Sequence, residues 1–445
     1  MEADEQCRCA FCRSDLPFSI PNHLVDELLN GNVVVFAGGG ISTENHDHAH
    51  DTFYKRIAAE LKADEGSSFP ELMSKYCSQP NGRIRLIQSI KDRFDYFIAF
   101  GDFYNQMTKF HRAISPMFMI KDVVTTNWDD FFERECALDA FVNESDMPLW
   151  SASKRRLLKI HGSIRNLGSI VATTEDYRAS ERRLNNGVMG AQLKALLAQK
   201  TFIYTGYSLS DSTFLKLAKR LAKMIYPNLR HSYFVSPQID MNKLSKFPIP
   251  LTPIQTDGAY FFEQLRVHVG KKAGILPDHA FESCEELLDR VVDEHIDAAD
   301  AFTSRPHPLL IFALSYQDGL IHGLGRISRQ KNTGEYHCRS HVAQRAQAYE
   351  MRAKEFRRKK DYWNACYAEG YCDALAHLLI SSERRIYKWP PLYGTHCGID
   401  FGTLSSITRF PKKKIDPRRI AQARRILAKV TSSGEVLIPD HTPYL

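Results

Sequence analysis

Short apolar runs alternate with amphipathic stretches along the first 270 residues of the chain. The runs are continuously apolar, as in strands covered on both faces of a sheet, whereas the stretches between them carry apolar residues at helical spacing. This alternation predicts an α/β fold, with a Rossmann-like parallel sheet and crossover helices. The predicted strands are residues 32–36, 122–126, 157–160, 170–173, 201–205 and 232–235.

The hydrophobic pattern changes near residue 271, where the strand signals fade and longer helical stretches begin. The clearest helical stretches beyond this point are residues 281–301, 340–380 and 417–430. We therefore expect three segments in the chain. They are a cysteine-containing tail over residues 1–19, a Rossmann-like domain over residues 20–270 and a mainly helical domain over residues 271–445.

Length and composition are those of a globular protein with two or three domains. The chain has 445 residues, of which 43% are hydrophobic and 25% charged, which excludes a largely disordered or collagen-like chain. No apolar run approaches the roughly 18 residues that span a bilayer, and the acidic start of the chain does not resemble a signal peptide. Ten cysteines are too few for a disulfide scaffold. We expect a cytoplasmic protein without a membrane segment.

The net charge of +7 is unevenly distributed along the chain. Residues 1–270 carry 32 basic and 31 acidic side chains, whereas residues 271–320 carry 4 and 10. Residues 321–430 carry 23 basic and only 9 acidic side chains. Such asymmetry predicts that the two domains have different partners.

Polar residues and glycines directly follow four of the predicted strands. In open α/β sheets, ligands bind in the crevice outside the carboxyl ends of the strands, so we expect these residues to converge on one site. They are Gly38, Gly39, Gly40, Asn127, His161, Gly206 and Ser208.

Each of these motifs also has a purely structural interpretation. The glycine loop should open a helix whose free N–H groups meet a pyrophosphate, but glycines also serve tight turns, and Thr43 stands where the dinucleotide fingerprint has its third glycine. Asn127 and Asp211 are suited to capping helices, as are Asp129 and Asp130. A histidine such as His161 is often only a satisfied structural residue. The convergence of the motifs is what favours a site.

Taken together, the motifs resemble the sirtuin family. The matching segments are Gly38-Gly-Gly-Ile-Ser42, Thr125-Thr-Asn-Trp-Asp129, His161-Gly-Ser163 and Gly206-Tyr-Ser208, each after a strand. The forms Thr-Thr-Asn and Gly-Tyr-Ser-Leu-Ser-Asp are most similar to the divergent bacterial sirtuin-like domains of antiphage defence. The resemblance covers about residues 20–265.

This resemblance implies an NAD⁺ glycohydrolase that acts as an antiphage effector by depleting NAD⁺. It implies that Asn127 and His161 are catalytic, with Asn127 holding a water or a ribose hydroxyl and His161 acting as a base or hydrogen-bond partner. Ser208 and Asp211 are expected near the adenosine half of NAD⁺. The residues expected to bind NAD⁺ are Gly38, Gly39, Gly40, Ser42, Thr126, Gly206, Ser208 and Asp211.

The chain departs from the protein deacetylases of the family in two places. Thr43-Glu-Asn-His stands where they carry Gly-Ile-Pro-Asp-Phe-Arg, and no cysteine lies between His161 and Gly206, where they carry a four-cysteine zinc ribbon. NAD-dependent protein deacylation is therefore the less favoured alternative. A second alternative is a module that binds NAD or ADP-ribose without turnover and reports to a partner.

Metal and partner sites are predicted from charge and cysteine patterns. Cys7, Cys9 and Cys12 resemble half of a zinc ribbon, although a disordered tail with free thiols is favoured. The histidine-rich stretch 46–50 is interpreted as a solvated loop. The basic stretch 411–430 either binds nucleic acid or, as we favour, pairs with the acidic stretch 278–300 in an interface. We expect a homo-oligomer. The resemblance adds a DNA-translocating ATPase or a short Argonaute as partner types.

Overall fold

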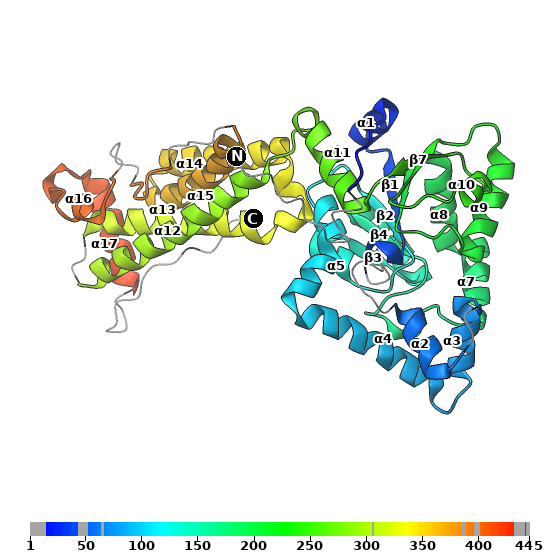
Figure 1. Cartoon of the computed structure of the whole chain (residues 1–445). Helices are drawn as coiled ribbons and strands as arrows, with labels where there is room; N and C mark the ends of the chain where they lie inside the picture. The colour runs from blue at the N-terminus through cyan, green and yellow to red at the C-terminus, as the bar shows by residue number, and fades with distance from the viewer. Residues whose placement is uncertain are drawn as a thin grey trace, which may run out of the picture. The chain divides into compact units, whose positions relative to one another are not determined.

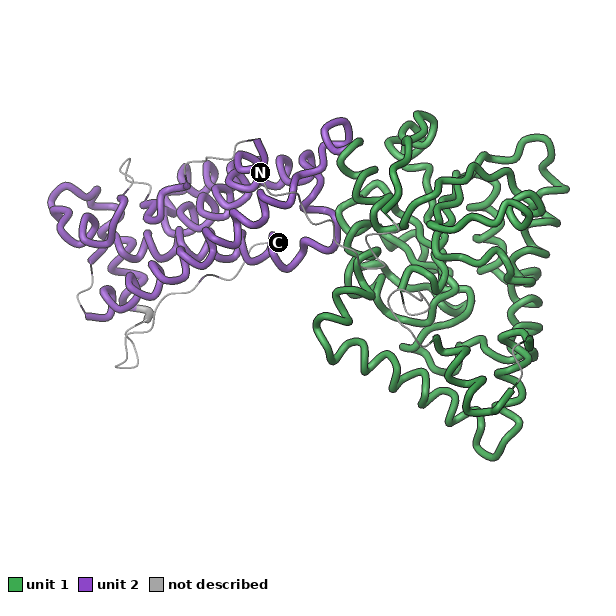
Figure 2. The backbone as a smooth tube through the Cα atoms, viewed as in Figure 1, with its two compact units in different colours: residues 1–269 green, residues 270–445 purple. Residues whose placement is uncertain are grey.

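The computed structural model describes residues 15–42, 52–63, 66–304, 307–383, 389–395, 401–430 and 441. The chain divides into two compact units, Met1–Val269 and Gly270–Leu445 (Figures 1 and 2). The division falls where the strand signals end in the sequence. The roles attached to the predicted segments 1–19, 20–270 and 271–445 stay predictions.

The first unit is built on a seven-stranded sheet whose strands are all parallel (Figure 1). The strand order is β3-β4-β2-β1-β5-β6-β7, so the chain leaves β1 toward β2 on one side and later toward β5 on the other. The predicted α/β, Rossmann-like class is confirmed. The strands are β1 Val33–Ala37, β2 Asp122–Thr125, β3 Asp139–Phe141, β4 Arg156–Lys159, β5 Thr201–Thr205, β6 Ser232–Ser236 and β7 Leu251–Gln255.

The prediction of a strand at residues 170–173 is wrong. This segment is extended but unpaired with any strand, because its donors go elsewhere: the N–H groups of Ala172 and Thr173 bond to the Asp176 carboxylate of the following helix. The edge strands β3 and β7 were not predicted. The first is only three residues long, and the second contains Pro253, which is tolerated at an edge.

Helices cover both faces of the sheet and extend beyond its carboxyl end. One hydrophobic core joins β1, β2, β4 and β5 to α7, α8 and α9, and a separate core packs α2, α3 and α4 together. The helices are α1 Asn22–Leu29, α2 Phe53–Leu61, α3 Phe69–Cys77, α4 Gly82–Ala99, α5 Gly101–Ile114, α6 Phe131–Cys136, α7 Thr174–Asn186, α8 Val188–Gln199, α9 Ser212–Ile225, α10 Met241–Ser245 and α11 Gly258–Ala273.

The second unit is helical throughout the part of it that the structure describes, apart from short turns and isolated bridges (Figure 1). Its central helix is α13, in which most side chains are buried. Gly319 of α13 and Gly370 of α15 let the two backbones approach closely, because a Cβ at either glycine would lie within 2.1 Å of a carbonyl oxygen of the other helix. The helices are α12 Asp278–Ser304, α13 Pro308–Arg329, α14 Arg339–Arg358, α15 Tyr362–Ser381, α16 Leu404–Thr408 and α17 Pro417–Val430.

None of the helices in the described ranges is both long and apolar enough to cross a membrane. Several of the helices predicted from the sequence are present at the predicted positions. The predicted basic helix 417–430 is confirmed as α17, whereas the predicted stretch 340–380 is two helices, α14 and α15, separated at Lys359–Asp361.

His111 on α5 is an unusual buried group in the first unit. It is fully buried against Phe131 and Phe132, with ring centroids 5.6 and 4.4 Å away, and neither ring nitrogen has a hydrogen-bond partner among the residues that the structure describes. Burial, aided by the nearby Arg112 and Lys159, lowers the pKa of His111 to about 3. The imidazole is therefore neutral in the folded protein over most of the pH range and packs as an aromatic ring.

This buried histidine should sensitise the first unit to acid. Because its pKa rises on unfolding, the neutral ring contributes stability above about pH 6.5 that is lost as the pH falls toward 3, by up to about 5 kcal/mol. We expect His111→Phe to flatten the fall in melting temperature between pH 7 and pH 4, measured by calorimetry. The exposed His268→Phe is the control, and an unchanged acid limb in His111→Phe would contradict the assignment.

Candidate active site

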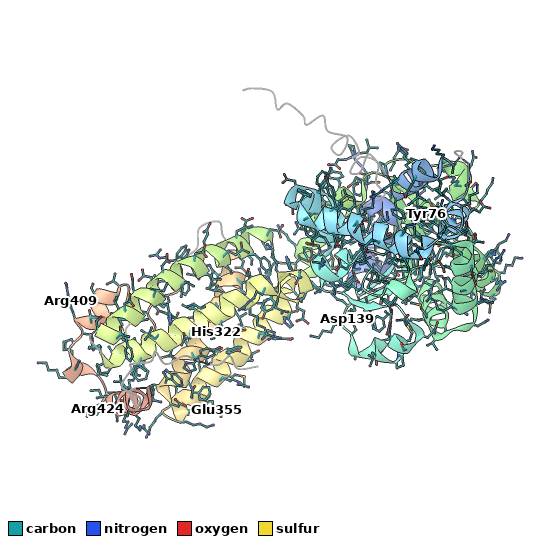
Figure 3. All side chains as sticks on the ribbon, turned by 90° about the horizontal axis from the view of Figure 1, so that it is seen from below. Tyr76, Asp139, His322, Glu355, Arg409 and Arg424 are labelled. Carbon is teal, nitrogen blue, oxygen red and sulfur yellow. The ribbon has the colours of Figure 1, made fainter. Side chains whose placement is uncertain are left out.

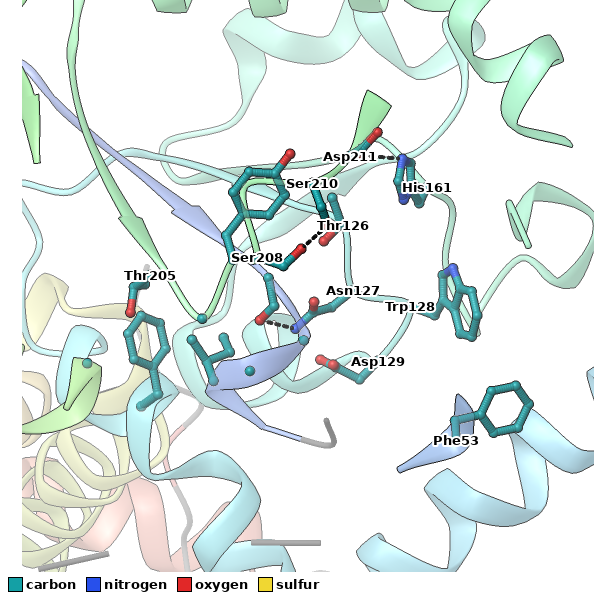
Figure 4. A pocket seen from close by; sticks show the side chains of 18 of the residues that line it. Phe53, Thr126, Asn127, Trp128, Asp129, His161, Thr205, Ser208, Ser210 and Asp211 are labelled. Atoms are coloured by element: carbon teal, nitrogen blue, oxygen red, sulfur yellow. Dashed lines mark hydrogen bonds and ion pairs between the residues drawn. The ribbon is translucent and has the colours of Figure 1, made fainter. Parts of the chain in front are cut away.

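A cavity of about 960 Å³ lies at the carboxyl end of the sheet (Figure 4). Loops after β1, β2, β4, β5, β6 and β7 all contribute to its walls, as expected for the crevice of an open parallel sheet. Its volume is suited to a sizeable organic ligand. Nine of the residues predicted from the sequence line it: Gly38, Gly39, Gly40, Thr126, Asn127, His161, Gly206, Ser208 and Asp211.

Ser42, the tenth predicted residue, does not line the cavity. Its side chain is fully buried, and its hydroxyl has no hydrogen-bond partner within the described part of the chain. An α-helix was expected to begin at the glycine loop. Over the described residues of this segment, which end at Ser42, the prediction is wrong, because Gly39–Ile41 forms a single 3₁₀ turn. Thr43 and the residues 46–50 lie outside the described ranges.

The glycine loop packs against the loop that follows β5. The N–H groups of Gly38 and Gly40 donate to the carbonyl oxygens of Thr205 and Gly206, at 3.0 and 2.9 Å. A Cβ on Gly38 would lie 2.5 Å from the Gly206 oxygen, and Gly206 itself has a φ of +56°. The glycines thus meet a packing requirement between two backbones, and two of the loop amides are already bonded.

Asn127 joins the loop after β2 to the glycine loop. Its Nδ2 donates to the carbonyl oxygen of Gly38 at 3.3 Å, and its backbone N–H donates to Thr125 Oγ1 at 3.0 Å. The side chain is 7% exposed and lines the cavity. The bond to Gly38 uses one of the two Nδ2 hydrogens, so the second Nδ2 hydrogen and the Oδ1 atom are the parts of the amide that can bond to a ligand (Figure 4).

His161 pairs with Asp211, which comes from a different strand end (Figure 4). His161 Nε2 lies 3.0 Å from Asp211 Oδ2, with both side chains more than nine-tenths buried. Asp211 Oδ1 caps α9 by accepting from the N–H groups of Thr213 and Phe214. Burial acts to raise the pKa of Asp211, but His161 and the two N–H groups outweigh it, so the pKa is lowered.

This pairing was not predicted, because Asp211 was expected near the adenosine half of NAD⁺. Both Asp211 oxygens have partners within the protein, which suits a residue that orients His161. Its role toward a ligand stays a prediction. Ser208 is placed differently, since it is exposed and bonds to Ser210 Oγ at 2.5 Å.

Tyr177 is a cavity residue that the sequence did not reveal. It comes from α7, and its ring lies 5.0 Å from the His161 ring at a steep angle. Burial, with the nearby carboxylate of Asp211, raises the pKa of Tyr177. Helices α7 and α8 occupy the stretch between His161 and Gly206, where the deacetylases have cysteines. No local motif marks Tyr177.

Asp129 and an aromatic wall were also missed as ligand-facing residues. Asp129 Oδ1 accepts from the Phe131 N–H, as expected of a cap, but Oδ2 has no hydrogen-bond partner in the described ranges, and the residue lines the cavity. Burial raises the pKa of Asp129 to about 6, against the opposing effect of Lys159. Beside it, the Trp128 ring lies 6.2 Å from Phe53 and 6.0 Å from Phe69.

Two basic side chains line the cavity, Arg93 of α4 and Lys109 of α5. Basic groups in a cavity of this kind suit phosphate groups, and nothing in the local sequence pattern had indicated either residue. Within the described ranges, no group of three or more metal-ligating side chains could hold a metal ion. The suggested zinc ligands Cys7, Cys9 and Cys12 lie outside the described residues.

The parallel sheet with a cavity at its carboxyl end defines the first unit as a Rossmann-like α/β unit, a fold in which ligands bind outside the carboxyl ends of the strands. Residues 121–248, from β2 to α10, match a family model described as a SIR2-like domain. This segment includes Asn127, His161 and Asp211. The predicted resemblance to the sirtuin family is confirmed by this match.

Curated relatives carry related names at low identity. The chain is 25% identical to "NAD(+) hydrolase ThsA" of Cytobacillus dafuensis over 224 residues, 49% of this chain and 43% of that protein. It is 24% identical to the protein of the same name in Enterococcus faecium over 218 residues, 47% and 44% of the two chains. It is 20% identical to "Defense-associated sirtuin 2" of Bacillus subtilis over 283 residues, which are 59% of this chain and 26% of that protein. The match spans less than half of each relative.

Proposed function

We propose that the first unit hydrolyses NAD⁺ to nicotinamide and ADP-ribose. The observation that carries the proposal is the convergence of Asn127 and of a His161–Asp211 pair on one cavity, inside the SIR2-like segment. The names of the relatives, NAD(+) hydrolase and defence-associated sirtuin, support the same activity and an antiphage role by NAD⁺ depletion.

The reaction breaks the bond between the ribose C1′ and the nicotinamide nitrogen. The pyridinium leaves with the bonding electron pair as neutral nicotinamide, and C1′ passes through an oxocarbenium-like state that a water molecule captures, releasing one proton. The amide Oδ1 of Asn127 is suited to hold that water or a ribose hydroxyl. His161, oriented by Asp211, is suited to accept the proton. Arg93 and Lys109 line the same cavity, and their positive charges are suited to the pyrophosphate.

Removing either proposed catalytic side chain should greatly slow turnover. We expect Asn127→Ala and His161→Ala each to lower the rate of nicotinamide release from NAD⁺ by roughly 10²–10⁴-fold. Chromatography of nicotinamide and ADP-ribose measures the rate, and circular dichroism checks that the fold persists. Asn242→Ala, at an exposed position on α10, is the control. Full turnover by a folded Asn127→Ala or His161→Ala variant would disprove the site assignment.

Asp211→Asn separates the histidine contact from the helix cap. Asparagine keeps an oxygen for the Thr213 and Phe214 N–H groups but replaces the carboxylate that faces His161. We expect kcat to fall by roughly 10²-fold with KM changed less than about threefold. The matched control is Asp240→Asn, because Asp240 caps α10 in the same way but is exposed. Equal kcat values for the two variants would exclude an orienting role.

The two alternatives give different results in the same assay. A module that only binds NAD or ADP-ribose would show no product with the wild-type chain, and its Asn127→Ala and His161→Ala variants would change affinity alone. A protein deacylase would release nicotinamide only when an acylated peptide is added. The absence of cysteines between His161 and Gly206 counts against deacylation.

We also propose that the helical unit serves assembly through opposite charges. Two basic segments that lie far apart in the sequence are joined, since Gln422 of α17 bonds to Asp361 and to the Tyr362 N–H at the start of α15, just after the basic end of α14. Figure 3 labels Glu355 of α14 and Arg424 of α17 along the lower edge of this unit in that view. The basic surface comprises Arg352, Lys354, Arg357, Arg358, Lys359, Lys360, Lys412, Lys413, Lys414, Arg418, Arg424 and Arg425, all exposed.

The complementary surface is on α12. Its exposed acidic side chains are Glu282, Glu285, Glu286, Asp289, Asp293, Asp297 and Asp300. Surfaces of opposite charge on one chain fit contact between two copies, whereas nucleic acid is the alternative partner of the basic surface. That the chain acts with a DNA-translocating ATPase or another defence protein as its partner stays a prediction.

The assembly proposal predicts salt-dependent association. We expect sedimentation velocity to show oligomers at low salt that dissociate as salt screens the charges. Arg424→Glu with Arg425→Glu should yield monomers, and mixing this variant with Asp289→Lys, Asp293→Lys should restore association. Lys219→Glu with Arg220→Glu on α9 is the control. If the Arg424, Arg425 variant associates normally but loses affinity for DNA, the basic surface binds nucleic acid instead.

A further inference from the structure

Lys159, the last residue of β4, is a fully buried cation in contact with two residues that line the cavity, Trp128 and Asp129. Its side chain is 0% exposed, and its Nζ contacts the carbonyl oxygens of Asp129 and Trp128, the latter at 3.5 Å. The third contact is Glu133 Oε1 on α6, at 3.1 Å. All three partners lie in the segment that directly follows Asn127.

These contacts account for the full hydrogen-bonding capacity of the ammonium group. A lysine ammonium has three N–H donors, and Lys159 meets three acceptors, two main-chain carbonyls and one carboxylate. Packing alone does not call for a charge here, because methionine would fill similar space without the cost of burying an ammonium and a carboxylate. What methionine lacks is any means of holding the two carbonyl groups.

The held carbonyls belong to the irregular turn between β2 and α6. Neither Trp128 nor Asp129 is part of a helix or strand, so their carbonyl groups depend on partners from elsewhere in the fold. The Trp128 oxygen also accepts from the Ile164 N–H at 2.7 Å. Lys159 stands two residues before His161, so its contacts tie the strand that leads to His161 to the turn that follows Asn127.

We propose that Lys159 is a positioning residue that sets the separation of Asn127 and His161, without itself touching the ligand. Lys159 is absent from the residues that line the cavity, which separates it from the residues that would touch NAD⁺. The inference rests on the proposed NAD⁺ hydrolysis. It goes beyond that proposal because it assigns a buried group outside the cavity to the control of the catalytic geometry.

The informative variant is the double substitution Lys159→Met, Glu133→Leu. Lys159→Met alone leaves Glu133 buried and unpaired, so loss of activity could reflect unfolding. Removing both charges relieves that cost, yet the Asp129 carbonyl loses the Lys159 donor and the Trp128 carbonyl keeps only the Ile164 N–H. We expect the double variant to be folded, with kcat lowered by roughly 10²-fold, since small misplacements of reacting groups have effects of that size. KM should change less than about threefold.

Two further variants test the specificity of this effect. Glu133→Gln keeps an oxygen for Lys159, and we expect its kcat to stay within about threefold of wild type. Lys200→Met is the matched control, because Lys200 Nζ also holds a main-chain carbonyl, that of Gly31 at 3.1 Å, but precedes β5 at the opposite end of the sheet. Its kcat should equal that of the wild type.

A readout without turnover keeps the inference separate from the proposed function. Hydrogen exchange of the peptide that contains residues 126–131 should become at least about tenfold faster in the double variant and stay unchanged in Lys200→Met. If the wild type shows no NAD⁺ hydrolysis, the proposed function fails and the exchange result alone decides the role of Lys159. Unchanged exchange, or a folded double variant with wild-type kcat, would overturn the inference.

Discussion

The close contact between the loops after β1 and β5 determines where the cavity residues lie. These strands are neighbours at the point where the chain reverses its direction across the sheet, and their loops touch backbone to backbone through Gly38, Gly40 and Gly206. The carbonyl group of Gly38, held in this contact, accepts from Asn127. A side chain on any of these glycines would separate the two loops, and the amide of Asn127 would lose its support.

Much of the first unit could be predicted from the sequence, because buried parallel strands are continuously apolar and end in recognisable residues. Residues 32–36 and 201–205 are of this kind, and the structure pairs them as β1 and β5. The segment 170–173 is similarly apolar but lies apart from the sheet. The N–H groups of Ala172 and Thr173 bond to the Asp176 carboxylate instead of to a neighbouring strand. An apolar composition predicts that a segment is buried. It does not predict whether the N–H groups of that segment bond to a neighbouring strand or to the side chain of a helix cap.

The cavity was predicted less completely, and the missing residues share a physical cause. Asn127 and His161 follow strands, so topology alone brings them to one edge of the sheet. Tyr177 lies within a helix, and the pairing of His161 with Asp211 joins residues fifty positions apart in the sequence. Lys159 looked like an ordinary strand residue, because a single polar position in an apolar run carries no sign of the three acceptors around it.

The glycine contacts between α13 and α15 have a consequence for how the helical unit can respond to a partner. Gly319 faces the Tyr367 carbonyl, and Gly370 faces the Tyr316 carbonyl, so each helix holds the other at two closely spaced points. Sliding by one turn would bring larger side chains against these carbonyls. The two helices are thus fixed in register, so a partner that binds either of them would meet α13 and α15 as one unit.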